Sequence, residues 1–336
     1  LYTNTSGSNN TALGYQSLWS NTTGSSNTAV GYYALKDATT EGSLTAVGYR
    51  AATNNTTGSG TVALGFDALT TNTTGDRNTA LGMYALRYNL TGSDNTATGY
   101  KALTANTTGD YNVAVGYRSL SANTSGGYNN AFGYDAMISN TTGLQNTAVG
   151  HTSLYSNTTA SGNAALGHGS LYANTTGTTN TASGVSSLYS NTTASYNTAI
   201  GGGALYDANR TADADGYNTA LGYNAGNTNT NDITTGNKNT LLGASTAADA
   251  ATATNQSVIG YGASGQADNS VTLGNADVTA VYMAQDAGAT VYAATLDISG
   301  DTDIDGTTNL DVVDIDGAVD IDGTTNLSGT VSLDGS

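Results

Sequence analysis

Residues 10–26 read N-T-A-L-G-Y-Q-S-L-W-S-N-T-T-G-S-S, and a second copy of this stretch begins at Asn27. A glycine marks the same place in twelve successive copies, always 17 residues after the previous one. These glycines are Gly14, Gly31, Gly48, Gly65, Gly82, Gly99, Gly116, Gly133, Gly150, Gly167, Gly184 and Gly201. A constant period over so many copies is typical of stacked structural units rather than of one globular core.

Each copy predicts one β-strand followed by a turn. Thr and Val exchange at the second residue of the copy, as in Thr79 and Val62, and an apolar residue usually stands two places later. β-Branched residues favour strands, and strand alternation places these two positions on one face and the intervening Ala on the other. The N-T-T-G segment predicts a tight turn with Asn and Gly at positive φ. Frequent Gly and Asn, without a 3.6-residue apolar period, exclude a helix.

We therefore predict an all-β fold, a parallel β-solenoid or β-roll with 17-residue coils. Twelve coils at the usual strand spacing would form a stack roughly 58 Å long. Each coil carries about three large apolar residues, which make a thin core even when the coils are stacked. We expect three parallel chains to bury the face that carries the small residues Ala and Gly, so that the protein is a homotrimer.

The repeat length divides the chain into four regions. Residues 1–206 form the regular 17-residue array, and residues 207–275 continue it with steps of 21, 21, 17 and 14 residues between marker glycines. Residues 276–296 lack the repeat and predict a β transition segment. Residues 297–336 carry one apolar residue about every six, which predicts a slender trimeric β shaft; three parallel hexapeptide solenoids are the alternative. The chain begins and ends inside a repeat, so we expect it to be a piece of a longer polypeptide.

Composition narrows the possible partners. The chain has no Cys and no Pro, and the missing Pro fits continuous strand ladders. A net charge of −17 argues against nucleic acid as a partner. No run approaches the 18 or more apolar residues of a membrane span, so we expect no membrane insertion in this fragment.

Two sets of residues have the types and spacings of metal ligands. Asp301, Asp303 and Asp305 have the spacing that starts a calcium-binding loop, and Gly306 follows them, but the residue at the last ligand position is Val312. His151 and His168 are one coil apart at a position usually held by Tyr, where zinc or iron could bind. The competing interpretations are solvated repeat faces for the Asp set and simple substitution of Tyr for the His pair. We therefore predict no cofactor, with calcium as the alternative.

Other repeated residues allow a binding or a structural interpretation. The Tyr column could stack on carbohydrate or pack against neighbouring coils or chains. The N-T-T sequons, such as Asn21-Thr22-Thr23, would accept glycans in a eukaryotic secreted chain, but turn chemistry also explains them. Two His, one Glu and no Cys form no distinctive catalytic set, so we predict that the protein is not an enzyme.

Part of the chain resembles known fibrous proteins. The coils Ser257-Val258-Ile259-Gly260 and Ser270-Val271-Thr272-Leu273-Gly274 resemble the head repeats of trimeric autotransporter adhesins, which implies a trimer of left-handed parallel β-rolls. The N-T-A-Φ-G-Y coils look like an expanded version of that unit. The run N-S-V-T-L-G-N-A-D-V-T-A-V-Y at 269–282, with the later D-I-D-G-T-T-N-L, is similar to tail-fibre proteins of marine bacteriophages.

These features predict a trimeric phage tail fibre on the virion surface that contacts a glycan or protein of the host cell. The two 21-residue coils add loops that we interpret as contact surfaces. The candidate contact residues are Asn209, Arg210, Asp213, Asp215, Asn229, Asn231 and Asp232. The alternative is a bacterial trimeric surface adhesin, which would be extracellular. A remoter alternative is an ice-binding solenoid. Such a protein requires a regular row of exposed Thr side chains, whereas strand alternation predicts that Thr points inward in this chain.

Overall fold

The computed structural model describes residues 2–209, 215–229 and 231–281. The predicted shaft at 297–336, the Asp301–Asp305 set, Arg210, Asp213 and most of the 276–296 segment lie outside these residues. The described part contains sixteen strands and no helix. The strands are β1 (Thr11–Leu13), β2 (Thr28–Val30), β3 (Thr45–Val47), β4 (Val62–Leu64), β5 (Thr79–Leu81), β6 (Thr96–Thr98), β7 (Val113–Val115), β8 (Asn130–Phe132), β9 (Thr147–Val149), β10 (Ala164–Leu166), β11 (Thr181–Ser183), β12 (Thr198–Ile200), β13 (Thr219–Leu221), β14 (Thr240–Leu242), β15 (Ser257–Ile259) and β16 (Val271–Leu273).

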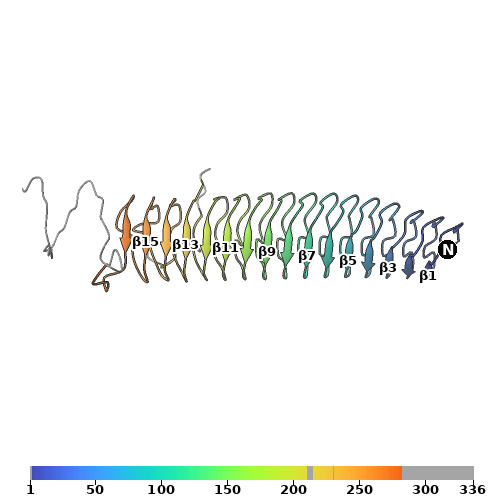
Figure 1. The fold of residues 1–336 in the computed structure, drawn as a ribbon, viewed down its shortest axis with the longest axis horizontal. Helices are drawn as coiled ribbons and strands as arrows, with labels where there is room; N and C mark the ends of the chain where they lie inside the picture. Colours follow the sequence, from blue (N-terminus) through green and yellow to red (C-terminus); the bar gives the residue numbers. More distant parts are fainter. Residues whose placement is uncertain (1, 210–214, 230, 282–336) are drawn as a thin grey trace, which may run out of the picture. The chain divides into compact units, whose positions relative to one another are not determined.

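The strands form one parallel sheet in sequence order, so each coil contributes one rung (Figure 1). Equivalent residues pair from coil to coil, as Thr79 pairs with Thr96. The register survives the 21-residue step, where Thr198 pairs with Thr219, because the extra residues lie outside the strand. The predicted parallel β-solenoid with coils of about 17 residues is confirmed.

Positions within a coil are numbered here from 1 to 17, with Asn10 at position 1 and Ser26 at position 17. The Ala at position 3 points into the coil, and Ala97 and Ala114 are fully buried. The Leu at position 9, such as Leu103, is fully buried beside it. Positions 2 and 4 face outward. The expectation that the Ala face lies between chains, with Thr turned inward, is therefore wrong: the Ala is buried inside its own chain, in one core cluster with the Leu of position 9.

The wall opposite the strand has no strand geometry, yet neighbouring coils satisfy its backbone. Lys101 at position 7 and Leu103 at position 9 both have positive φ, 56° and 51°. Lys101 N donates to Met83 O of the preceding coil, and Leu103 N donates to Ser119 O of the following one, each at 3.0 Å. A Leu in the left-handed region costs roughly 1–2 kcal/mol, so these bonds between coils hold each coil in a shape that it would not adopt alone.

Close backbone contact favours glycine at two positions of the coil, position 5 in the twelve regular coils and position 15 in most of them, where Glu41, Ala160 and Ala194 are the exceptions. Gly99, at position 5, has φ of 128°, and a Cβ there would stand 2.4 Å from Gly116 O. Gly109, at position 15, is the Gly of an N-T-T-G segment, and a Cβ there would stand 2.3 Å from Gly126 O. The prediction that this segment holds Asn and Gly at positive φ is wrong, since neither Asn106 nor Gly109 has a positive φ. Its Gly is favoured by the close approach of the next coil rather than by φ.

Two buried asparagines close each regular coil onto one carbonyl group. Gly109 O accepts from Asn106 Nδ2 at 2.9 Å and from Asn95 Nδ2 at 2.8 Å. The same asparagines join successive coils, because Asn123 Nδ2 donates to Asn106 Oδ1 at 2.8 Å and Asn112 N donates to Asn95 Oδ1 at 3.0 Å. Both asparagine columns are fully buried here, so the solenoid has a hydrogen-bonded polar core beside its thin apolar one. We call this arrangement the asparagine clasp.

Natural interruptions show the dependence between coils. Ala38 and Ala208 stand at position 12, where most coils have Asn. Asn21 Oδ1 and Asn191 Oδ1, one coil earlier in each case, are buried and have no hydrogen-bond partner. A column loses one bond wherever the next coil lacks its amide.

Asn106→Ala should lower the free energy of unfolding by about 1–3 kcal/mol, because it removes the partner of the buried Asn89 oxygen and one of the two acceptors of the buried Asn123 amide. Thermal unfolding followed by circular dichroism measures the loss. Thr108→Ala, two residues away on the exposed edge, is the matched control and should change stability by no more than about 0.5 kcal/mol. Equal losses in the two variants would contradict a structural role for the clasp.

Candidate functional site

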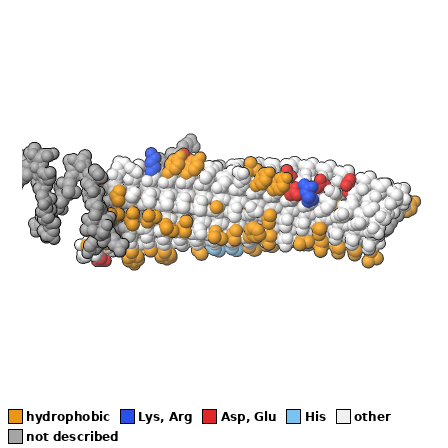
Figure 2. Space-filling view, viewed as in Figure 1, with side chains coloured by type: hydrophobic (Ala, Val, Ile, Leu, Met, Phe, Trp, Pro, Cys, Tyr) orange, Lys and Arg blue, Asp and Glu red, His pale blue; other side chains and the backbone are white. Residues whose placement is uncertain are grey.

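The outward side chains of the sheet form an uncharged face along the solenoid, with mostly Thr at position 2 and mostly large apolar residues at position 4. This outer sheet face consists of positions 2 and 4 of β1–β16, and none of its residues is charged. Large apolar side chains at position 4 remain exposed, including Leu13 at 67%, Leu166 at 54% and Leu221 at 49%. Figure 2 shows hydrophobic side chains in rows along the molecule. Exposed apolar surface of this extent is typical of an interaction site.

A shallow depression interrupts the outer sheet face at β9–β11. Ala164 replaces the usual Thr at position 2, and Ser183 replaces the usual large residue at position 4. The smaller side chains leave a shallow apolar depression of about 270 Å³, lined also by Leu166 and Val149. The sequence shows these two substitutions, but only the fold places them side by side.

The Tyr column at position 6 packs mainly against itself. Tyr117 stacks on Tyr100 at 5.2 Å between ring centroids and on Tyr134 at 4.9 Å. Interior rings of the stack therefore cover each other's faces. This supports packing between neighbouring coils and leaves those ring faces unavailable to a sugar. A second stack at position 10 runs through Tyr155, Tyr172, Tyr189 and Tyr206.

His151 and His168 continue the position-6 stack. Their ring centroids lie 5.1 Å apart with an interplanar angle of 6°, and Tyr134 stacks on His151. Within the described residues, no group of three or more His, Cys, Asp or Glu could hold a metal ion. A zinc or iron site at this pair would need ligands from other chains, and its occupancy stays a prediction.

The candidate contact residues in the first inserted loop make local contacts. Asn209 Oδ1 accepts from Thr192 Oγ1 at 2.6 Å, which ties the loop to the preceding coil. Asp215 Oδ2 accepts from Tyr217 Oη at 2.9 Å, and this hydrogen bond raises the pKa of the Tyr217 phenol.

In the second inserted loop, the Asp232 carboxylate caps a turn. Its Oδ1 accepts from the backbone N of Thr228 and of Asn229, the latter at 2.7 Å. Asn229 and Asn231 line a polar groove of about 460 Å³. The groove is the feature of these loops that could hold a ligand.

Ion pairs joining successive coils were not anticipated from the sequence. They cluster in one part of the solenoid (Figure 2). The Asp67 side chain, only 3% exposed, lies 3.0 Å from Arg87 Nη2 and 3.6 Å from Arg50 Nε. Arg118 pairs with Asp135 through Nε at 2.9 Å, and this bond raises the pKa of Arg118. Spacings near 17 residues could have revealed these pairs once a stacked fold was assumed.

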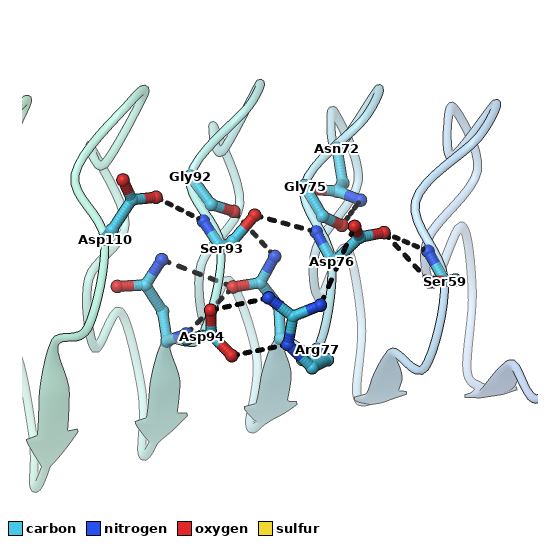
Figure 3. Close-up of polar contacts among 11 residues, drawn as sticks. Ser59, Asn72, Gly75, Asp76, Arg77, Gly92, Ser93, Asp94 and Asp110 are labelled. Carbon is cyan, nitrogen blue, oxygen red and sulfur yellow. Dashed lines mark hydrogen bonds and ion pairs between the residues drawn. The ribbon is translucent and has the colours of Figure 1, made fainter.

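A neighbouring network uses carboxylates to cap exposed backbone amides (Figure 3). Asp76 Oδ1 accepts from Ser59 N, and Asp110 Oδ1 accepts from Ser93 N, both at 2.7 Å. Arg77 Nε donates to Asp94 Oδ1 at 2.7 Å. This hydrogen bond lowers the pKa of the Asp94 carboxyl and raises that of Arg77. These contacts hold successive coils together, and we assign them no ligand.

The sequon asparagines lie inside the solenoid. Asn106 and Asn140 are fully buried, and each Nδ2, the atom that a glycan would modify, is hydrogen-bonded. The turn preferences of Asn and Gly therefore explain the repeated N-T-T segments only in part, because the Asn of each segment forms the buried hydrogen bonds of the asparagine clasp. Glycan attachment and the folded coil are therefore incompatible.

No helix among the described residues is long and apolar enough to cross a membrane. No protein-family model and no curated protein matches the chain. The structure shows the architecture of the described residues, a parallel β-solenoid built from coils of about 17 residues.

The Arg77–Asp94 pair should stabilise the protein only where Asp94 is charged. Because the pKa of Asp94 is lowered in the folded state, its contribution is present above the ordinary carboxyl pKa of about 3.9 and is lost as the pH falls below that value. Asp94→Asn should lower the melting temperature slightly at pH 7, since exposed pairs are weak, and the difference should shrink as the pH falls below the ordinary carboxyl pKa of about 3.9. A difference that persists unchanged at the lower pH would contradict this assignment.

Glycosylation should prevent folding. When the chain passes through a eukaryotic secretory pathway, molecules that carry glycans at the N-T-T sites should be sensitive to protease, because the modified Asn cannot enter the coil. Blocking glycan transfer with tunicamycin should restore protease resistance. Protease-resistant protein with occupied sites, detected by mass spectrometry, would refute the burial argument.

Proposed function

We propose that the chain is a structural segment of a homotrimeric extracellular fibre that attaches to a host-cell surface. The observation that carries the proposal is the uncharged outer sheet face with its row of large apolar side chains at position 4, which no element of the described residues covers. We prefer a phage tail fibre as the parent protein, because the run at residues 269–282 and the later D-I-D-G-T-T-N-L segment resemble those of marine phage tail fibres. A bacterial trimeric surface adhesin is the alternative.

The dimensions of the face suit association between copies. Sixteen strands at the usual spacing span about 70 Å, and a face about 10 Å wide would bury roughly 700 Å² per partner, close to the usual value for stable complexes. The net charge of −17 per chain opposes self-association elsewhere, whereas this face carries no charge. A second copy is therefore a suitable partner for it.

A stiff trimer also favours attachment at several points. Every strand of the described sheet pairs with the next, and most coils are also joined by the clasp and by stacked rings, as between Tyr117 and Tyr134. Weak contacts repeated on three chains give avidity when the spacing between them is fixed. The host partner, a glycan or a protein, would be engaged by the loops of the 21-residue coils.

Ice binding is the second candidate. One observation favours it: Thr at position 2 faces outward on a regular parallel sheet, as in Thr45 and Thr79, contrary to the inward position that strand alternation gave it. Position 4 is mostly large and apolar, and Phe132 projects from the face, so a continuous two-rank Thr surface does not form. The fibre is therefore preferred.

Light scattering of the purified chain should give a mass three times the 33.6 kDa of one chain. Leu64→Lys together with Leu166→Lys should reduce the mass to that of a monomer, because both lie on the outer sheet face and would place charges in the interface. Thr74→Lys, on the exposed edge, is the matched control and should remain trimeric. A folded wild-type monomer would refute the trimer, and thermal hysteresis in that monomer would favour ice binding.

A further inference from the structure

Two tyrosines at the C-terminal end of the described solenoid differ from the rest of the position-6 column. Tyr223 and Tyr261 are 66% and 76% exposed, and neither ring stacks on another aromatic ring of the described residues. The cause is the small residue at position 6 of the coils beside them: Gly202 precedes Tyr223, and Ala244 separates the two tyrosines. The ring surfaces that Tyr117 uses for packing are therefore left open on these two.

The spacing of the two rings suits an extended ligand. Tyr223 and Tyr261 are two coils apart, which corresponds to about 10 Å at the usual strand spacing. This is close to the length of a disaccharide unit in an extended glycan. An exposed aromatic face offers the apolar face of a sugar ring a flat partner.

The residues that follow Tyr223 and Tyr261 in the chain, Asn224 and Gly262, line a polar groove. Asn224, Ser245 and Gly262 each follow the position-6 residue of their coil, and they line the groove of about 460 Å³ together with Asn227 and Ser264. A second groove of about 510 Å³ also has Gly262 and Ser264 in its lining. Together they extend along the last coils of the described solenoid.

The polar atoms of this groove are available to a ligand. The side chains of Asn224, Asn227, Ser245 and Ser264 have no hydrogen-bond partner among the described residues, whereas the buried asparagines of the clasp have both amide ends engaged. Amide and hydroxyl groups donate and accept hydrogen bonds in the pattern that sugar hydroxyls require. No cation lines the groove.

The surrounding charge selects against acidic ligands. Residues 215–281 contain five Asp and one Lys, so this part of the solenoid is negative and would repel carboxylated or sulfated chains. A neutral ligand with many hydroxyl groups fits both the charge and the groove.

We propose that Tyr223, Tyr261 and the adjoining groove form a binding site for a neutral polysaccharide, with the two rings as stacking platforms and Asn224, Asn227, Ser245 and Ser264 as hydrogen-bonding groups. This deepens the proposed attachment function and rests on it for its biological meaning. The site lies within one chain, so a homotrimer would present three copies. Binding at one site would be weak, and the three copies would raise the avidity.

The test uses the full chain and a panel of soluble polysaccharides: dextran, a β-glucan, a mannan and a galactan as neutral probes, and alginate as an acidic one. Affinity electrophoresis identifies the polysaccharide that binds, and isothermal titration calorimetry gives its Kd. Tyr223→Ala and Tyr261→Ala should each weaken binding about ten-fold, and the double variant should abolish it. Asn227→Ala, which leaves both rings in place, should weaken binding to a smaller extent.

Tyr134→Ala is the matched control, because that ring is also exposed at its edge but is covered on both faces by Tyr117 and His151. It should bind the polysaccharide like the wild type. Absence of binding to every neutral probe, binding to alginate alone, or wild-type affinity in the double variant would each overturn the site. If the site fails while the chain remains trimeric and still adheres to cells, the proposed fibre function stands without it.

Discussion

The asparagine clasp is the interaction on which the rest of the solenoid depends. In one coil, Asn95 and Asn106 direct both of their amide groups at the carbonyl oxygen of Gly109, which brings the two ends of the coil together. The side-chain oxygens then bond to the next coil. A coil of this size has too little apolar volume for a conventional core, and the buried amides supply the missing cohesion. Because an unpaired buried amide is costly, each coil is stable only with its neighbours in register.

This dependence explains why the repeat length is so constant. A change of one residue would move every Asn, Ala and Leu out of its column and would leave buried polar groups unpaired. The 21-residue steps are tolerated because their additional residues lie outside the strand, and Asn218 still reaches Asn197 Oδ1. Variation is therefore confined to positions that face outward, where the chain can change its surface without changing its shape.

The outward positions give different parts of the solenoid different surfaces. Ion pairs such as Arg118–Asp135 occur within residues 36–135, whereas residues 136–206 contain no Asp, Glu, Lys or Arg. The open rings of Tyr223 and Tyr261 lie in the last coils, where the residues that follow them, Asn224 and Gly262, line a polar groove. In such a scaffold we expect binding sites where a column of stacked side chains is interrupted, because side chains inside an uninterrupted column contact mainly one another.

The sequence by itself determined the period, the single strand per coil, the parallel order and the exclusion of a helix, because a strict 17-residue repeat with β-branched residues at fixed places has few other solutions. It also placed the buried Leu of position 9. Only the tertiary structure decided which strand face is inward, because Thr-Ala-Val has apolar character on both sides, and the closed coil buries its Ala in one core cluster with the Leu of position 9. The left-handed Leu103 and the role of Asn in N-T-T-G were equally inaccessible, since local preferences predict the reverse. The open rings of Tyr223 and Tyr261 were visible only as departures from a column, and a column exists only once the coils are stacked.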